Sequence, residues 1–130
     1  MPQHPPEFDG FFAALGRQAL AFPRCAACGR FHWYPMKRCP HCGSGDIGWQ
    51  EVEGEGEIFS WTAVRHAFDP AYADRLPYVV ALVEFADAPG VRLVTNVAAD
   101  PAALRIGMRV RPAFAAGDAP DAVAFRPVDG

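Results

Sequence analysis

The sequence predicts a mainly β protein in which a short N-terminal helix precedes a cysteine-containing ribbon and a five-stranded barrel. Two observations carry this prediction. All four cysteines fall within residues 25–42 as two Cys-x-x-Cys pairs. The residues after 50 form apolar, strand-prone runs separated by turn residues. We expect an N-terminal helical segment at 1–22, the ribbon at 23–50 and the barrel domain at 51–130.

The composition bounds the class of protein. The chain has 130 residues, of which 51% are hydrophobic, and a formal net charge of −3, which is typical of a globular domain. Basic residues form no run, which disfavours binding to a phosphate backbone. No apolar stretch approaches the ~20 residues of a membrane span, and the N-terminus lacks the features of a signal peptide. We therefore expect a cytoplasmic protein with no membrane association and with reduced thiols.

The N-terminal stretch EFDGFFAALGRQALAF, residues 7–22, is predicted to be helical because its apolar side chains recur at i, i+3, i+4 and i+7. The stripe consists of Phe8, Phe11, Phe12, Leu15, Ala19 and Phe22. We expect it to pack on its own domain. The alternative is that Phe8, Phe11 and Phe12 form a partner interface by docking into a groove.

The cysteine pairs are predicted to bind zinc. Each Cys-x-x-Cys forms a tight turn whose two sulfurs point the same way, and two such turns complete a tetrahedron around one Zn²⁺. Glycine follows the second cysteine of each pair, at Gly29 and Gly43, where a knuckle turn commonly needs positive φ. Residues 23–50 are thus predicted to be a zinc ribbon whose ligands are Cys25, Cys28, Cys39 and Cys42.

Other readings of the cysteines are two disulfides, a redox Cys-x-x-Cys and a catalytic zinc. Disulfides need an oxidising compartment, and a thioredoxin-like motif needs a single pair on a βαβ unit. Four thiolates fill the zinc tetrahedron and leave no position for water. We therefore expect one structural zinc per chain, and we expect His32 and His41 to be surface or packing residues rather than ligands.

The barrel prediction rests on five apolar runs. They lie at 57–64, 78–85, 91–98, 108–114 and 122–128. A long loop at 65–77 joins the first two runs, a hairpin turn is predicted at 87–90, and a short helix or turn at 100–107. Five strands with a helical segment between the third and fourth match an OB-fold barrel. The alternative is an open sandwich or an SH3-like barrel.

In order, these elements resemble the acyl-CoA-associated family of zinc-ribbon/OB-fold proteins. The stretches that carry the resemblance are RCAACGRFHWYPMKRCPHCGS, GEGEIFSWTAV, LPYVVALVEF and LRIGMRVRPAF. It covers nearly the whole chain. The resemblance implies a rubredoxin-like ribbon and a non-catalytic subunit that stabilises a partner enzyme and helps frame the path of its CoA thioester.

The partner implied is a thiolase-like enzyme, a class that includes thiolases, aldolases and ketoacyl synthase-like enzymes. A MaoC-type enoyl-CoA hydratase is the alternative. The resemblance further implies acyl-CoA as the ligand and a hetero-oligomer. No residue of the chain is assigned a catalytic role.

The stretch VRHAFDPAYADRLPY, residues 64–78, is the candidate for contact with CoA. It joins the first two strands, and in an OB fold that loop borders the ligand face. Guanidinium and imidazole groups of Arg65, His66 and Arg75 are expected to meet phosphates. Aromatic rings of Phe68, Tyr72 and Tyr78 are expected to stack on adenine or line an acyl channel. The alternative is an ordinary surface loop.

Two further functions are alternatives to an accessory role. A single-stranded nucleic-acid binder would use Trp61, Phe59 and Phe85 as stacking platforms. Core packing is favoured for all three, and the acidic stretch EVEGEGE at 51–57 opposes nucleic acid. An autonomous enzyme would use Asp69, Asp74 or Glu84 as acid or base. Nothing in their sequence context marks these carboxylates.

Overall fold

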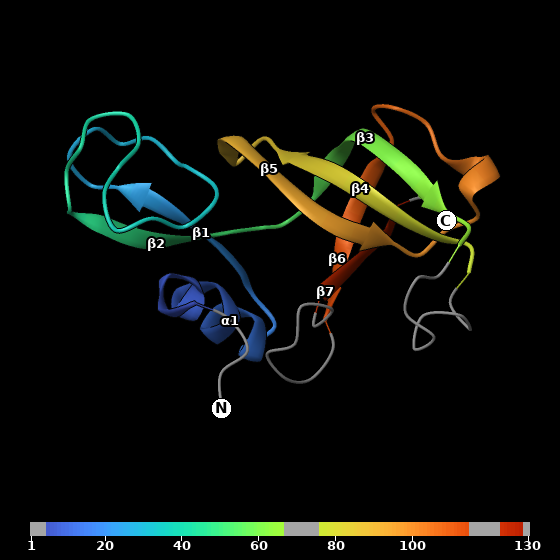
Figure 1. Ribbon diagram of the computed structural model, residues 1–130, viewed down its shortest axis with the longest axis horizontal. Coiled ribbons are helices and arrows are strands. Elements are labelled where there is room, and N and C mark those ends of the chain that lie inside the picture. Colours follow the sequence, from blue (N-terminus) through green and yellow to red (C-terminus); the bar gives the residue numbers. More distant parts are fainter. Residues whose placement is uncertain (1–4, 67–75, 115–122, 129–130) are drawn as a thin grey trace.

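The computed structural model describes residues 5–66, 76–114 and 123–128. Figure 1 shows two parts, a helix with a two-stranded ribbon at one end and a barrel at the other. The N-terminal part contains η1 (Pro6–Phe8), α1 (Asp9–Gly16), β1 (Leu20–Cys25) and β2 (Ile47–Val52). The barrel contains β3 (Gly56–Val64), β4 (Tyr78–Phe85), β5 (Ala88–Val97), η3 (Pro101–Ala103), β6 (Arg109–Phe114) and β7 (Val123–Pro127).

The helix is shorter than the sequence predicts. α1 ends at Gly16, and Gln18 takes a left-handed φ of 57°, which turns the chain back. The residues expected to form the last helical turns are instead paired with β2, in the register Leu20↔Val52 to Cys25↔Ile47. The prediction that Ala19 and Phe22 continue the helical stripe is therefore wrong. Among the described residues, no helix has the length and apolarity that a bilayer crossing requires.

The barrel closes in the order β3-β4-β5-β7-β6. β5 and β7 run parallel at Val97↔Phe125, and the remaining neighbours are antiparallel. η3 lies between the third and fourth barrel strands, where Asp100 caps it by accepting a hydrogen bond from the backbone N–H of Ala102. Five strands in this order with a helical insertion form an OB-fold, as predicted.

The β4–β5 hairpin turns two residues earlier than expected. Phe85 pairs with Ala88, so the turn consists of Ala86 and Asp87 rather than 87–90. Pro89 and Gly90 lie within β5, where the register shifts, and Gly90 has a φ of 90°. Such a bulge pushes the hairpin backbone outward.

One core runs through both parts. Phe22 on β1 is fully buried, and its ring centroid lies 5.1 Å from that of Phe85 on β4. Phe85 in turn lies 5.9 Å from Phe125 on β7. On its other side Phe22 contacts Phe11 of α1 at 6.4 Å. β1 is buried on both faces because the helix covers one and the barrel end covers the other, which explains its nearly continuous apolar sequence.

Replacement of Gly56 with alanine is expected to destabilise the barrel. A Cβ at this buried position would lie 2.6 Å from both the Glu84 carbonyl oxygen and Val83 Cγ1. The Glu84 oxygen belongs to the backbone of β4, which cannot move aside as a flexible side chain could. We therefore expect the free energy of unfolding to fall by about 1–3 kcal/mol. The measurement is the urea unfolding midpoint. Gly48→Ala is the matched control, since nothing lies within 4 Å of its added Cβ; an equal effect of the two substitutions would contradict the packing argument.

Candidate metal centre and the cleft beside it

Two knuckle turns of similar design position the cysteines. In the first, the backbone N–H of Gly29 donates to the Cys25 carbonyl at 2.8 Å. In the second, the N–H of Gly43 donates to the Cys39 carbonyl at 2.9 Å. The two glycines have φ values of 77° and 82°, which confirms the positive φ expected at both. β1 ends at Cys25 and β2 begins at Ile47, so the ribbon strands hold the base of the site.

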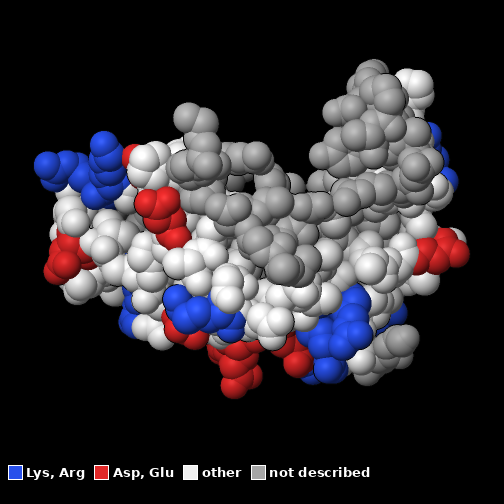
Figure 2. Space-filling model, turned by 90° about the horizontal axis from the view of Figure 1, so that it is seen from below, with Lys and Arg blue, Asp and Glu red and all other residues white. Residues whose placement is uncertain are grey.

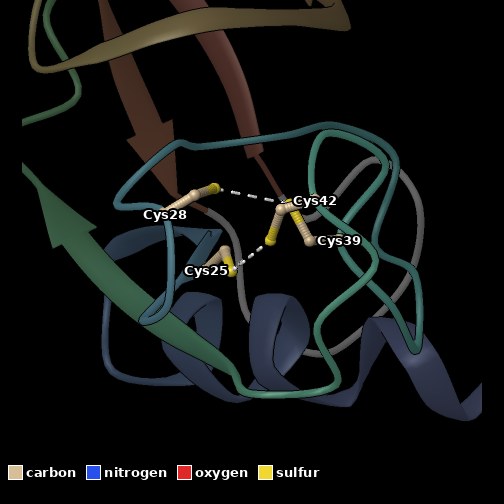
Figure 3. A group of neighbouring side chains, drawn as sticks. All are labelled: Cys25, Cys28, Cys39 and Cys42. Carbon is tan, nitrogen blue, oxygen red and sulfur yellow. Dashed lines mark hydrogen bonds between the residues drawn. The ribbon is translucent and has the colours of Figure 1, made fainter.

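The four sulfurs fit one zinc ion. All four Sγ atoms lie within 4.8 Å of one another, and their side chains point toward a common centre (Figure 3). Cys25 Sγ lies 3.6 Å from Cys42 Sγ, and Cys28 Sγ lies 3.7 Å from Cys39 Sγ. A tetrahedron with Zn–S bonds of ~2.3 Å has edges of about 3.8 Å. The S–S bond of a disulfide is ~2.05 Å long, so these sulfurs are too far apart to form one. The chain thus presents a four-thiolate site that matches one structural zinc.

The thiols differ in their electrostatic surroundings. Burial raises the pKa of Cys39, but donation from the backbone N–H groups of His41 and Cys42 and from neighbouring thiols outweighs it and lowers the pKa to about 6. At Cys42 the backbone N–H of Ser44 favours the thiolate. The contacts with Cys25, burial, and the other thiols outweigh this effect and raise the pKa to about 11. A bound divalent cation favours the thiolate at every ligand, so loading the site releases protons.

The two nearby histidines do not join the cysteine cluster. His32 is 4% exposed, and neither of its ring nitrogens has a hydrogen-bond partner among the described residues. Burial, and then the proximity of His41, lower its pKa. His41 Nε2 lies 3.3 Å from the Phe31 carbonyl oxygen. The structure therefore places His32 in a packed position and His41 at the surface.

The predicted CoA-contacting segment is described only at its ends. Arg65 and His66 are exposed after β3, and Tyr78 is half-buried at the start of β4. Val64 pairs with Tyr78, which brings the two ends of the loop to one edge of the barrel. Phe68, Tyr72 and Arg75 lie outside the described residues. CoA contact by this segment stays a prediction.

The aromatic residues proposed for a partner interface pack largely within the chain. Phe11 is 6% exposed and belongs to the core, whereas Phe8 and Phe12 are half-buried. Trp33, from the ribbon spacer, lies over this group at 5.0 Å from Phe11 and 5.7 Å from Phe8. The helix is thus joined to the zinc ribbon by an aromatic cluster.

The three aromatic residues considered as stacking platforms have different environments. Phe85 belongs to the core and Trp61 packs against that core, as expected for both. For Phe59 that expectation is wrong, because its side chain is 42% exposed. Gly56 and Ile58 are buried while Glu57 and Phe59 are exposed, so the alternation of β3 places Phe59 on the outer face. There the Arg92 guanidinium lies 4.1 Å from its ring centroid.

A cleft beside the metal centre was not anticipated from the sequence. It has a volume of about 640 Å³ and separates the ribbon from the bulge of the β4–β5 hairpin. Its walls include Arg24, Arg30, Phe31, Trp33, Pro89 and Gly90. The stretch RFHW, residues 30–33, supplies part of the ribbon half of this lining, but no sequence pattern places Pro89 and Gly90 opposite it.

Comparisons with known proteins agree with this architecture. Residues 12–48 match the family profile described as "ChsH2, rubredoxin-like zinc ribbon domain". Residues 49–115 match "ChsH2, C-terminal OB-fold domain". The structure titled "Ltp2-ChsH2(DUF35) aldolase" superposes with a TM-score of 0.82 and 36% identity, covering 98% of each chain. A DUF35-family protein of unknown function from Sulfolobus solfataricus shares the fold, with a TM-score of 0.67, 18% identity and coverage of 94% of this chain and 85% of that one.

Two curated relatives share part of their length with this chain. A Thermomonospora curvata protein named "Probable enoyl-CoA hydratase alpha subunit" is 43% identical over 101 residues, which are 77% of this chain and 30% of that protein. A Pyrococcus furiosus protein named "DUF35 domain-containing scaffold protein" is 33% identical over 72 residues, 55% of this chain and 52% of that one. With its four-cysteine ribbon, its closed OB barrel and these matches along nearly its whole length, the chain belongs to the ChsH2-type DUF35 family of zinc-ribbon/OB-fold proteins.

Proposed function

We propose that the chain is a non-catalytic accessory subunit that binds and stabilises a thiolase-like enzyme and helps frame its acyl-CoA site. The observation that carries this proposal is the end-to-end match to a chain of the Ltp2-ChsH2(DUF35) aldolase structure, at 36% identity. Cysteines that ligate zinc are not available as nucleophiles, so the reaction itself is assigned to the partner. Such a site needs reduced thiols, which supports a cytoplasmic location for the working complex.

The outer face of β3, β4 and β5 supports a protein partner. Along β4 the inward residues are buried, and the outward residues alternate with them. Val80 and Leu82 point outward and are only half-buried, while Val94 opposite Leu82 is 52% exposed. Figure 1 views this sheet in front of β6 and β7. A strand that is apolar on both faces is typical of a sheet covered on both sides, and exposed apolar patches of this kind mark interaction sites.

The second candidate is an accessory role in a MaoC-type enoyl-CoA hydratase. The specific observation in its favour is the Thermomonospora curvata relative, which is the more similar of the two curated relatives at 43% identity and carries a hydratase name. Because this chain corresponds to 30% of that protein, the hydratase activity is proposed for a partner rather than for this chain.

Binding of single-stranded nucleic acid is the third function considered, and the charges of the described residues oppose it. On the face shown in Figure 2, basic and acidic side chains lie next to one another. Arg17 pairs with Glu51 at 3.1 Å, Arg92 with Glu84 at 3.0 Å, and Arg109 with Glu55. An electropositive groove needs arginines that are free to meet phosphates.

Affinity capture of the tagged full-length protein from its native cytoplasm, with mass spectrometry of the recovered proteins, tests the proposal. We expect stoichiometric recovery of a thiolase-like enzyme. Recovery of an enoyl-CoA hydratase would establish the second candidate, and salt-sensitive recovery of nucleic acid would establish the third. A monomer that recovers no companion would contradict an accessory role.

Substitution of Val94 with glutamate is expected to reduce recovery of the enzyme at least about tenfold, because a charge would be desolvated in the apolar contact. Recovered enzyme per mole of tagged chain is the measurement. Met36→Glu is the matched control, since Met36 is 48% exposed and lies in the zinc ribbon, outside the β3–β4–β5 sheet. Equal losses in both variants, or in neither, would contradict docking through that face.

A further inference from the structure

The cleft beside the metal centre is built from two parts of the chain that are distant in sequence. Its first wall comes from the zinc ribbon, with Arg24, Arg30 and Phe31, and its second from Pro89 and Gly90 of the β5 bulge. Ligand pockets in proteins typically have volumes of roughly 300–1,000 Å³ and mostly apolar walls. At about 640 Å³, with aromatic and proline side chains in its walls, this cleft falls within that class.

The charge of the cleft is positive although the chain is acidic overall. Among the described residues, its lining contains two arginines and two histidines and no Asp or Glu. Arg24 is held in place, because its Nε donates to the Gly29 carbonyl at 3.0 Å and its guanidinium lies 5.5 Å from the Phe31 ring centroid. Arg30 is exposed and makes no ion pair within the described structure. One fixed guanidinium and one available guanidinium thus flank the half-buried Phe31 ring.

Polar groups in the wall of the cleft also lack partners. Both ring nitrogens of His32 and Nε1 of Trp33 are buried and make no hydrogen bond with the described residues. Buried polar groups are nearly always paired in folded proteins. These atoms lie beneath the surface of the wall, so the contacts offered to a bound ligand come from Arg24, Arg30 and Phe31.

We propose that this cleft binds a planar heteroaromatic ring that carries phosphate, and that in the working complex it holds the nucleotide end of the acyl-CoA. The proposal rests on the accessory function proposed above. The Phe31 ring packs against the heteroaromatic ring. Arg24 and Arg30 form charge-assisted hydrogen bonds to the phosphate oxygens. Among the described residues of the 64–78 segment, Arg65, His66 and Tyr78 do not line the cleft.

The test is a titration of the zinc-loaded, ¹⁵N-labelled full chain with adenosine 3′,5′-bisphosphate, followed by NMR. Saturable shifts are expected at the backbone amides of both Gly29 and Gly90, which lie on opposite walls. Adenosine without phosphate, and pyrophosphate without a ring, are each expected to bind at least about tenfold more weakly. No saturable shift, or shifts confined to residues outside the cleft, would overturn the proposal.

Arg30→Gln is expected to weaken binding of adenosine 3′,5′-bisphosphate about tenfold while leaving zinc content unchanged, since Arg30 makes no contact that supports the knuckle through its side chain. Arg126→Gln on β7 is the matched control, because Arg126 is equally exposed and lies outside the cleft. Equal weakening by both would indicate nonspecific attraction and overturn the site.

The nucleotide titration and the affinity capture test the cleft proposal and the accessory function separately. If the wild-type chain captures the enzyme but the nucleotide causes no shift at Gly29 and Gly90, the cleft proposal fails and the accessory function stands. If the nucleotide binds in the cleft but no enzyme is captured, the cleft proposal stands and the accessory function fails.

Discussion

Replacing Cys39 with serine is expected to remove the zinc ion and unfold the ribbon. Cys39 is 3% exposed, and its Sγ lies 3.7 Å from that of Cys28 within the four-sulfur cluster. A structural zinc contributes about 10–16 kcal/mol to small ribbon-type modules, and in such modules metal binding and folding are one process. We expect the zinc content to fall from one ion per chain to nearly none, as measured by elemental analysis of the purified protein.

The effect is expected to reach beyond the knuckles. Loss of the ribbon would expose Trp33 and Phe22, which contact each other at 5.3 Å, and Phe22 in turn covers the barrel core at Phe85. His41→Ala is the matched control. His41 is a neighbour of the ligands, and only its backbone N–H donates to Cys39 Sγ, at 3.3 Å, so the substitution should retain the metal. Full zinc content in the serine variant, or an unchanged fold in a strong chelator, would contradict a structural role.

The zinc site could be predicted from sequence because every determinant is local. The spacing of the four cysteines fixes the ligand set. The glycine that follows each Cys-x-x-Cys pair indicates that the turn needs a positive φ at that position. The barrel strands were equally accessible, because turn residues interrupt apolar runs of strand length. Their order around the barrel follows from the short connections and the η3 segment.

The errors arose where tertiary contacts override a local pattern. The apolar stripe of 7–22 matches a helical period, but its second half also satisfies a strand that is buried on both faces. Pairing with β2 decides in favour of the strand, and Gln18 in the left-handed region separates the two elements. Phe59 was expected in the core because its side chain is apolar, yet it alternates with the buried Gly56 and Ile58 and therefore faces outward.

The cleft could not be predicted for a related reason. Arg24, Arg30 and Phe31 are adjacent to the knuckles and visible in the sequence, yet they form a cavity only because Pro89 and Gly90 stand opposite. That placement depends on how the ribbon sits against the barrel, and the shared core through Phe22 and Phe85 fixes it.

The position of Phe22 makes it the residue on which both parts of the molecule depend. Its side chain is fully buried, and its ring contacts Phe11 of the helix, Trp33 of the ribbon and Phe85 of the barrel. These three contacts come from three different segments of the chain. A cavity at this position would therefore weaken the packing of the ribbon against the barrel as well as the packing around Phe22 itself.

Replacing Phe22 with alanine is expected to lower the free energy of unfolding by about 3–5 kcal/mol, the range for deletion of a buried phenyl ring. Because domains are commonly stable by only ~5–15 kcal/mol, this loss is a large fraction of the total. Urea unfolding followed by tryptophan fluorescence and by zinc release is the measurement, and both transitions should shift together since one core serves both parts. Phe59→Ala is the matched control: that ring is 42% exposed and its main described contact is with Arg92, so the expected cost is about 1 kcal/mol. A Phe22→Ala midpoint close to that of Phe59→Ala, or a shift in zinc release alone, would show that the ribbon and the barrel are stabilised separately.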